Sequence, residues 1–600
     1  MKTIKIIFIG IIISVSTCFT YGQENVYFKA MQDELNRNIE NLKLEGLQNP
    51  FFISYTLENN YRIDVNSTLG TILESVMKEK AIPSVRLMVG DYQLNDENFS
   101  DQSGFSFGGS FNSNKTTIEE DYWSIRRDFW LQTEKTYKSA AEKYEKKLSA
   151  IETQNLSEEL KNLPDFTKVD PVVKVSKSAA YRAEKDKVDQ LATELSSLFK
   201  GNAQITSSGV QISCYHSDIY LINNEGTKVK DVVNIVKVGI NASSQATDGM
   251  IFDDELNFYA NKFEELPSTE IMRNKIIAFI QHLVDLKNAP VLEDSYFGPV
   301  VINNSAVADL YSKKYFERSK MNAKRDQIKT NVNRGMPGGS GSNLGDKIDD
   351  DILPAGFNIV DDPSITEHNG IKTIGHFAVD GEGVEPKALK LIENGVLKTL
   401  YNNRTPSLKI AESNGHYRYK LGFTGLKTSI APGVVKIDND NAVHRKKLIK
   451  SAIKLAKKNG LDYYIEIEKM QSEADGSSSS GSVYTIFSGG GSKSDETNAF
   501  VAYKVFLKNG KRELLRPVTL KGVGGKLESV NTTTSSNYVH NTLKSFAGSG
   551  FKFIMISGAS FEGTPSTFIV PETVLFERLK VEKQKILSTD KLPAVPNPII

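Results

Sequence analysis

The chain has 600 residues, which is more than one hydrophobic core usually supports, so we expect at least two domains. Its 74 Lys and Arg residues nearly balance its 73 Asp and Glu residues, and the net charge of +1 gives no overall field that would attract a polyanion. We therefore expect no nucleic-acid partner, and the ordinary hydrophobic content of 39% argues against a disordered chain.

The N-terminus has the pattern of a secretory signal. Lys2 and Lys5 precede a short apolar run, and Thr20 and Gly22 stand three and one positions before a cut after residue 22. The apolar run is shorter than a membrane-spanning helix. We therefore expect residues 1–22 to be removed and the mature protein to be exported, either periplasmic or secreted.

Only two cysteines are present. Cys18 allows an alternative in which the protein is a lipoprotein, but Thr17 is an unfavourable residue directly before an acylated cysteine, so soluble export is preferred. Without Cys18 no internal disulfide can form. Cys214 lies in an alternating apolar stretch, which favours a buried thiol over a nucleophile. No later apolar run is long enough to predict a transmembrane helix.

In the N-terminal half, residues 51–57 and 85–90 read as two strands that flank a less regular segment. Apolar residues then recur at spacings of three, four and seven over two segments joined by a proline-containing connection. This pattern predicts an antiparallel helical hairpin over about residues 128–200. The hairpin would pack on its own sheet or, alternatively, bind a partner as a coiled coil. The apolar stripe of each helix is short for a coiled coil, which favours the first interpretation.

Further strands are predicted at residues 210–214, 219–222 and 232–240, with a turn at residues 223–226. Ser268 is a candidate N-cap for a following helix. A change to short strands and many glycines after this helix places a domain boundary near residue 290. The sequence thus predicts an α+β protein, with an N-terminal α/β domain over residues 23–290 and a β-rich C-terminal domain over residues 291–600.

Motifs for catalysis are mostly missing. No His-Glu-x-x-His or Gly-x-Ser-x-Gly sequence occurs. His368 and His376 are the closest pair of histidines, eight residues apart, and without a third ligand at a recognisable spacing an incidental pair is the favoured interpretation. A cluster of aspartates at positions 349–351, 361 and 362 lacks the alternation of a calcium loop, so we expect it to be a solvated acidic loop.

Three stretches of the second half carry a family resemblance. Residues 380–384 read Asp-Gly-Glu-Gly-Val, residues 391–401 contain an Asn394-Gly395 turn between apolar runs, and residues 413–419 read Ser-Asn-Gly-His-Tyr-Arg-Tyr. They resemble the C-terminal domain of the TldD/PmbA (TldD/TldE) metallopeptidase family. Three further segments are similar to its opening strand, its first helix and its second hairpin, respectively residues 298–302, 306–310 and 505–511.

The resemblance implies a zinc-less role for this chain. Catalytic members carry a zinc-binding His-Glu-x-x-x-His on the helix after the opening strand and a cysteine near the end of the domain. Residues 304–318 contain no histidine and residues 540–572 contain no cysteine, so the chain is more similar to TldE/PmbA than to TldD. We expect no cofactor, or zinc if the family activity is retained. Family likeness also implies a homodimer, or a heterodimer with a zinc-bearing TldD-like chain, that acts on a peptide or unfolded protein segment.

Three hypotheses follow. The chain is a non-catalytic subunit in exported peptide processing, or a stand-alone peptide-binding protein whose glycine-rich loops at 334–351 and 488–495 close over extended chains. Alternatively, it is an active peptidase with an unconventional metal site that uses His368, His376 or His416.

Overall fold

The structure is a computed structural model that describes residues 25–100, 120–153, 157–329, 343–422, 426–471, 496–522, 530–546 and 562–584, with a few residues between 592 and 598. The predicted signal over residues 1–22, the first half of the glycine-rich loop at 334–351 (residues 334–342) and the loop at 488–495 lie outside the described residues. Within them, helices and several separate sheets confirm the predicted α+β class.

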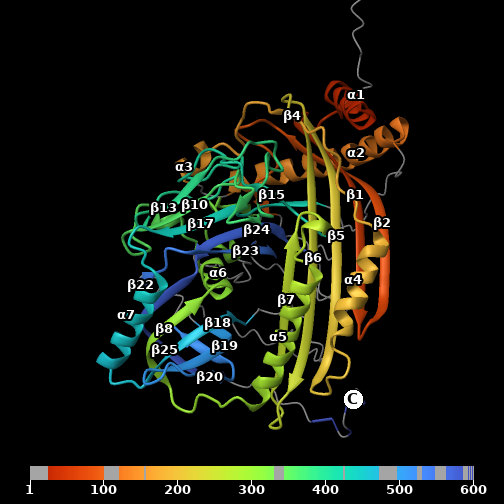
Figure 1. The fold of residues 1–600 in the computed structure, drawn as a ribbon. Helices are drawn as coiled ribbons and strands as arrows, with labels where there is room; N and C mark the ends of the chain where they lie inside the picture. The colour runs from red at the N-terminus through yellow and green to blue at the C-terminus, as the bar shows by residue number, and fades with distance from the viewer. Residues whose placement is uncertain are drawn as a thin grey trace, which may run out of the picture.

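A six-stranded sheet organises the N-terminal half, in the order β2-β1-β5-β6-β4, with β7 also paired to β6. Its strands are β1 (Pro50–Thr68), β2 (Thr71–Val89), β4 (Val173–Val175), β5 (Ile205–Asn223), β6 (Lys228–Gln245) and β7 (Ile251–Ala260). Neighbouring strands are antiparallel except for β4 and β6. The long strands β5, β6 and β7 run side by side along one side of the molecule (Figure 1).

Strands β1 and β2 differ from the sequence prediction. They form one continuous hairpin of two 19-residue strands, closed by a turn at Leu69 and Gly70, and between residues 57 and 85 the pairing is interrupted only by a bulge at Asn66 and Ser67 next to that turn. The middle of β1 is polar on one face, where Glu58 and Arg62 are buried. A strand can have one polar and one apolar face, because successive side chains point to opposite sides of the sheet.

Five helices accompany this sheet: α1 (Val26–Asn41), α2 (Tyr122–Thr153), α3 (Glu158–Asn162), α4 (Lys185–Ser197) and α5 (Thr269–Asn288). Helix α2 packs with α1 against β1, β2 and β5, whereas α4 packs with α5 in a separate core over β1, β5 and β6. The two predicted helices therefore exist, but the predicted hairpin between them is wrong. Each helix buries its apolar stripe against the sheet, which offers more apolar surface than the other helix does.

Two local predictions are confirmed here. The Ser268 hydroxyl accepts a hydrogen bond from the Ile271 amide at the start of α5. The turn at residues 223–226 joins β5 to β6, with Gly226 at φ +104°. The segments predicted as separate strands at 210–214 and 219–222 are parts of the single strand β5.

The C-terminal half contains two larger sheets. One has the order β14-β13-β10-β17-β24-β23 and comprises β10 (Phe357–Asp361), β13 (Leu389–Glu393), β14 (Val396–Leu397), β17 (Val434–Asn439), β23 (Asn537–Lys544) and β24 (Thr564–Pro571). The other comprises β8 (Tyr296–Asn303), β18 (Tyr463–Met470), β19 (Glu496–Phe506), β20 (Arg512–Leu515), β21 (Val518–Lys521), β22 (Val530–Thr533) and β25 (Thr573–Lys583). Its order is β18-β8-β25-β21-β19-β20, and an additional β18–β19 pairing closes five of these strands into a ring.

Short elements complete this half. The small pairs are β3 (Phe99–Ser100) with β9 (Ile328–Lys329), β11 (Glu367–His368) with β12 (Ile371–Lys372), and β15 (Tyr417–Lys420) with β16 (Lys427–Ile430). Helix α6 (Ser305–Tyr311) continues into a π-helix over Ser312–Phe316 and lies between the two larger sheets (Figure 1). The main core contains residues from both sheets and α6. Helix α7 (Arg445–Lys458) covers the outer side of the second sheet.

Two Asn-Gly sequences, at residues 394–395 and 509–510, form the turns of the two expected hairpins. Asn394 and Gly395 adopt φ +49° and +87° between β13 and β14, and Gly510 adopts φ +69° between β19 and β20. These positive φ values are those of tight hairpin turns, which Asn and Gly tolerate better than other residues.

The two halves are interlocked. Phe500 and Val501 of β19 pack into the core beneath α4 and α5, and β3 of the first half pairs with β9 of the second. Among the residues that the structure describes, no helix is both long and apolar enough to cross a membrane.

Candidate functional site

Helix α6 occupies the place where the family resemblance located a zinc-binding helix. It follows β8 directly, and its side chains at Ala306, Val307, Ala308 and Leu310 are buried in the main core. Asp309 is the only acidic residue of α6 and remains partly exposed. Any chemistry on this helix therefore depends on Asp309 and on what faces it.

Asp309 faces an ammonium group and not a metal-ligand set. Lys544, at the end of β23, donates a 3.0 Å hydrogen bond from Nζ to Asp309 Oδ1 and lies 3.8 Å from Glu317 Oε1. His540 Nε2 is 4.0 Å from the same Asp309 oxygen. Burial raises the pKa of Asp309, but Lys544 and His540 outweigh it and hold that pKa below its usual value. The carboxylate is therefore ionised and matched by an internal cation.

The same cluster lies beside the N-terminal sheet. Lys469 of β18 donates a 2.6 Å hydrogen bond to Asp254 Oδ1 of β7 and also influences Asp309 electrostatically. Across the part of the chain that the structure describes, no three His, Cys, Asp or Glu side chains come together in an arrangement that could hold a metal ion. The donor set around α6 thus does not fit a zinc site.

The three candidate histidines lie in separate places. His368 is half-exposed in the small β11–β12 hairpin. His376 donates from Nδ1 to the Thr373 carbonyl at 2.9 Å, and burial lowers its pKa, so the neutral ring keeps Nε2 as an acceptor. His416 is fully buried and donates from Nδ1 to the Asn414 carbonyl at 2.9 Å.

His416 belongs to a buried polar cluster with Asp361. Its Nε2 lies 3.6 Å from Asp361 Oδ2, an oxygen that also accepts hydrogen bonds of 2.7 Å from the Tyr401 hydroxyl and the Gly433 amide. Burial lowers the pKa of His416, so this ring is neutral. The expectation of a solvated acidic loop is wrong for Asp361, because β10 carries its side chain into the interior.

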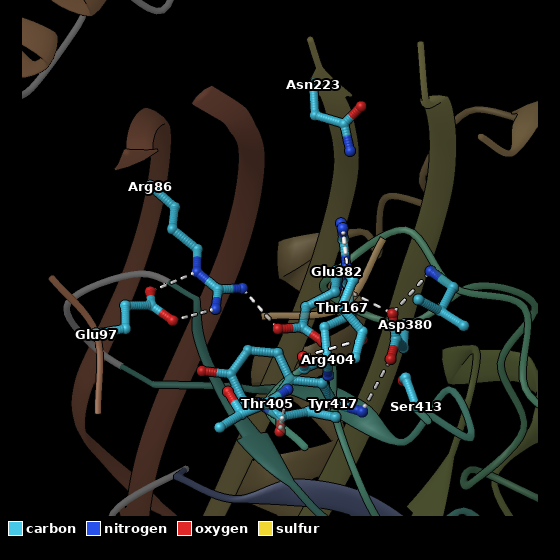
Figure 2. A network of polar contacts seen from close by, with 12 residues as sticks. Arg86, Glu97, Thr167, Asn223, Asp380, Glu382, Arg404, Thr405, Ser413 and Tyr417 are labelled. Carbon is cyan, nitrogen blue, oxygen red and sulfur yellow. Dashed lines mark hydrogen bonds and ion pairs between the residues drawn. The ribbon is translucent and has the colours of Figure 1, made fainter. Parts of the chain in front are cut away.

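The Asp-Gly-Glu-Gly segment at 380–383 connects the two halves (Figure 2). Asp380 accepts three backbone hydrogen bonds, from Glu382 and Val384 on Oδ1 and from Tyr417 on Oδ2. Glu382 is buried and accepts a 2.6 Å hydrogen bond from Arg86 of β2, whose other donors bind Glu97. Asp380 therefore stabilises the conformation of its own loop, and Glu382 links this loop to the N-terminal sheet through Arg86.

Arg404 is the second link in this network. Its side chain is fully buried, and both terminal nitrogens donate 2.7 Å hydrogen bonds to the carboxylate of Glu225 in the β5–β6 turn. The guanidinium also donates to the Thr167 carbonyl and lies 3.9 Å from the ring centre of Phe166. A bidentate, stacked arginine of this kind fixes two segments in one geometry.

A cavity of about 630 Å³ lies between β6 and the C-terminal half. Asp231, Val233 and Ile235 of β6 form part of one wall, and His376 and Arg418 form part of the other. Of the three candidate histidines, only His376 lines this cavity. The cavity has the size of a site for a small molecule or a short peptide.

The sequence of the region that contains these residues matches a known family. Residues 298–470 match the family described as the PmbA/TldA metallopeptidase C-terminal domain. Residues 298–470 therefore form a domain of the TldD/PmbA metallopeptidase family. The matched TldD/PmbA region contains β8, α6 and the segments that hold His376, Arg404 and Arg418.

One curated relative is similar to this chain in sequence. A protein named "Metalloprotease" from Methanothermobacter thermautotrophicus is 32% identical over 97 residues. The alignment spans 15% of this chain and only 20% of that protein.

Solved structures share the fold over most of the chain. TldE from Thermococcus kodakarensis superposes with a TM-score of 0.53 at 12% identity, covering 92% of this chain and 100% of that one. A protein from Thermotoga maritima, described as a candidate modulator of a DNA gyrase, gives 0.51 at 15% identity over 92% and 100% of the two chains. A similarly described protein from Bacteroides thetaiotaomicron gives 0.52 at 10% identity over 93% and 99%. At these identities the likeness establishes a TldD/PmbA-like fold.

Sequence reasoning missed most of the polar residues that the fold brings together. Arg86, Glu225 and Lys544 had no local motif, because each finds its partner in a distant segment. Arg418 was noted only as part of the resembling stretch at 413–419. Cys214 is buried as predicted, and burial raises the pKa of its thiol to about 12.

Proposed function

We propose that this chain is a non-catalytic, TldE-like subunit of an exported assembly that processes peptides, partnered by a zinc-bearing TldD-like chain. The observation that carries the proposal concerns α6, the helix on which catalytic relatives are expected to hold zinc. Its one carboxylate, Asp309, is paired with Lys544 of strand β23. An ammonium between Asp309 and Glu317 supplies the positive charge that a metal would otherwise provide. The fold can then be kept without metal chemistry in this subunit.

A second candidate function is stand-alone peptide binding, as a homodimer or a monomer. It is favoured by the cavity of about 630 Å³ between β6 and the C-terminal half. The third hypothesis, an unconventional metal site, has less support. His368, His376 and His416 lie in different surroundings, and His416 is fully buried with its ring turned toward Asp361.

Co-purification tests the first function. The mature chain, without residues 1–22, is expressed alone and together with a zinc-bearing family member from the same organism, and both samples are analysed by size exclusion, metal content and cleavage of an unfolded peptide. We expect the chain alone to carry no stoichiometric zinc and to leave the peptide intact, and the pair to form a complex that cleaves it.

The opposite result is equally clear. One equivalent of zinc in the isolated chain, together with peptide cleavage that is lost in His376→Ala but kept in the control His368→Ala, would overturn the proposal and support the unconventional site. A homodimer that binds peptide and ignores the zinc-bearing chain would support the second function. Cell fractionation of the full-length chain tests the predicted export separately.

A further inference from the structure

A buried cation lines the cavity beside β6, and it forms no ion pair with any carboxylate of the described residues. Arg418, on β15, lines the cavity and is only 6% exposed. Among the residues that the structure describes, no carboxylate oxygen lies within 4 Å of its guanidinium. This differs from Arg404, which is also buried but is paired with Glu225. Asp361 acts on Arg418 electrostatically but forms no ion pair with it. A buried guanidinium without a hydrogen-bonded anion is costly, so a ligand that supplies one gains affinity.

The hydrogen bonds of Arg418 leave its carboxylate-binding edge available. Nη1 donates to the backbone carbonyls of Pro432 and Pro565, and the guanidinium stacks 4.4 Å from the ring centre of Phe377. No hydrogen bond from Nε or Nη2 is formed to the described residues. These two nitrogens are on the edge of the guanidinium that binds a carboxylate with two parallel hydrogen bonds.

The other cavity walls limit what the ligand can be. Val233 and Ile235 on β6, together with Phe377 from the C-terminal half, supply apolar surface. Asp231 and Asp362 also line the cavity, and they would repel a ligand with a second negative charge. Lys174, the other cation of the lining, is already 3.4 Å from Glu385.

We propose that this cavity binds a ligand through a single carboxylate that pairs with Arg418, while an apolar group of the ligand packs against Val233, Ile235 and Phe377. The free C-terminus of a peptide and a smaller apolar carboxylic acid share this chemistry, and both fit a cavity of about 630 Å³. The choice of peptides as one source rests on the proposed function, whereas the carboxylate site rests on the cavity alone.

Calorimetric titration of the mature chain tests the proposal with three probes: the dipeptide Ala-Phe, its C-terminal amide, and 3-phenylpropionate. We expect the two carboxylates to bind with one site per chain and the amide to bind at least tenfold more weakly. Arg418→Gln should weaken carboxylate binding at least tenfold. The matched control is Arg325→Gln, because Arg325 also donates to backbone carbonyls but is paired with Asp165 and lies outside the cavity lining.

A second variant covers the case in which Arg418→Gln fails to fold. Val233→Trp leaves Arg418 in place and fills the cavity, so it should abolish binding of both carboxylates. Equal binding of Ala-Phe and its amide, or unchanged binding by either folded cavity variant, would overturn the proposal. If 3-phenylpropionate binds and Ala-Phe does not, the result would support the carboxylate site and contradict a peptide ligand. Assembly with a zinc-bearing chain is measured in a separate experiment, so failure of the proposed function can be distinguished from failure of this site.

Discussion

Lys544 Nζ lies 3.0 Å from Asp309 Oδ1, so the one carboxylate of helix α6 is matched by an ammonium group from the end of strand β23. The two residues are 235 positions apart in the sequence. Their pairing joins the helix to the first sheet of the C-terminal half and leaves α6 without a free carboxylate.

Replacement of this ammonium should destabilise the fold. Lys544→Met keeps the length of the side chain but leaves Asp309 facing Glu317 without a cation, so we expect a loss of about 1–2 kcal/mol in the free energy of unfolding. Urea denaturation measures it. The double variant Asp309→Asn with Lys544→Met should recover part of the loss, and Lys390→Met, which breaks an exposed pair with Glu393, serves as a neutral control. A fully stable single variant would contradict this assignment.

Arg404 should be among the most sensitive positions. Arg404→Met removes the partner of a buried carboxylate, Glu225, and we expect it to cost about 3–5 kcal/mol of unfolding free energy. Hydrogen exchange should rise in the β5–β6 turn and around Thr167, because both are held by the guanidinium. Adding Glu225→Gln removes the unpaired charge and should restore part of the stability; if the double variant is no more stable than the single one, the pair is not the cause.

Buried neutral histidines should make the protein sensitive to acid. Burial lowers the pKa of both His216 and His282 to about 4, whereas an unfolded chain titrates near 6.5. Between these values the unfolded state binds the extra proton, so stability falls as the pH drops from about 6.5 to about 4. Each group contributes a slope of about 1.4 kcal/mol per pH unit within that window.

The variant His282→Gln isolates one of these groups. Denaturation at pH values from 4.5 to 7.5 should show a pH dependence that is shallower than that of the unmodified chain. The matched replacement His368→Gln, at a half-exposed position of the β11–β12 hairpin, is the control for changing a histidine to glutamine outside the core. Parallel curves for His282→Gln and the unmodified chain would rule out this contribution.

Gly415 should not tolerate a side chain. Its φ is +75°, and a Cβ there would lie 2.6 Å from Pro386 Cα and 2.7 Å from the Glu385 carbonyl oxygen. Gly415→Ala therefore combines left-handed strain with a backbone clash, and we expect a loss of about 2–4 kcal/mol. Gly460→Ala is the matched control, because Gly460 has φ +68° but nothing within 4 Å, so its loss should be about 1 kcal/mol. Equal losses, measured by thermal denaturation, would show that the close contact is unimportant.

Local sequence signals predicted local structure well. The Asn394-Gly395 turn and the Ser268 cap lie where the sequence placed them, because each depends on residues a few positions apart. The first helix of the C-terminal half lies where the family resemblance placed it. The middle of β1 was missed although apolar and polar residues alternate through it. Its polar face is buried against the second half of the chain, where the Leu426 amide donates to Glu58.

The sequence by itself determined the family resemblance, the missing histidines on the helix after β8 and the single internal cysteine, since these depend only on which residues are present. Tertiary structure decided which group faces Asp309 and which residues line the cavity. Lys544 pairs with Asp309, and Arg418 lines a cavity together with β6, only after distant segments have folded together. Charge pairing in a buried site depends on distances of a few ångströms, which spacing along the chain does not encode.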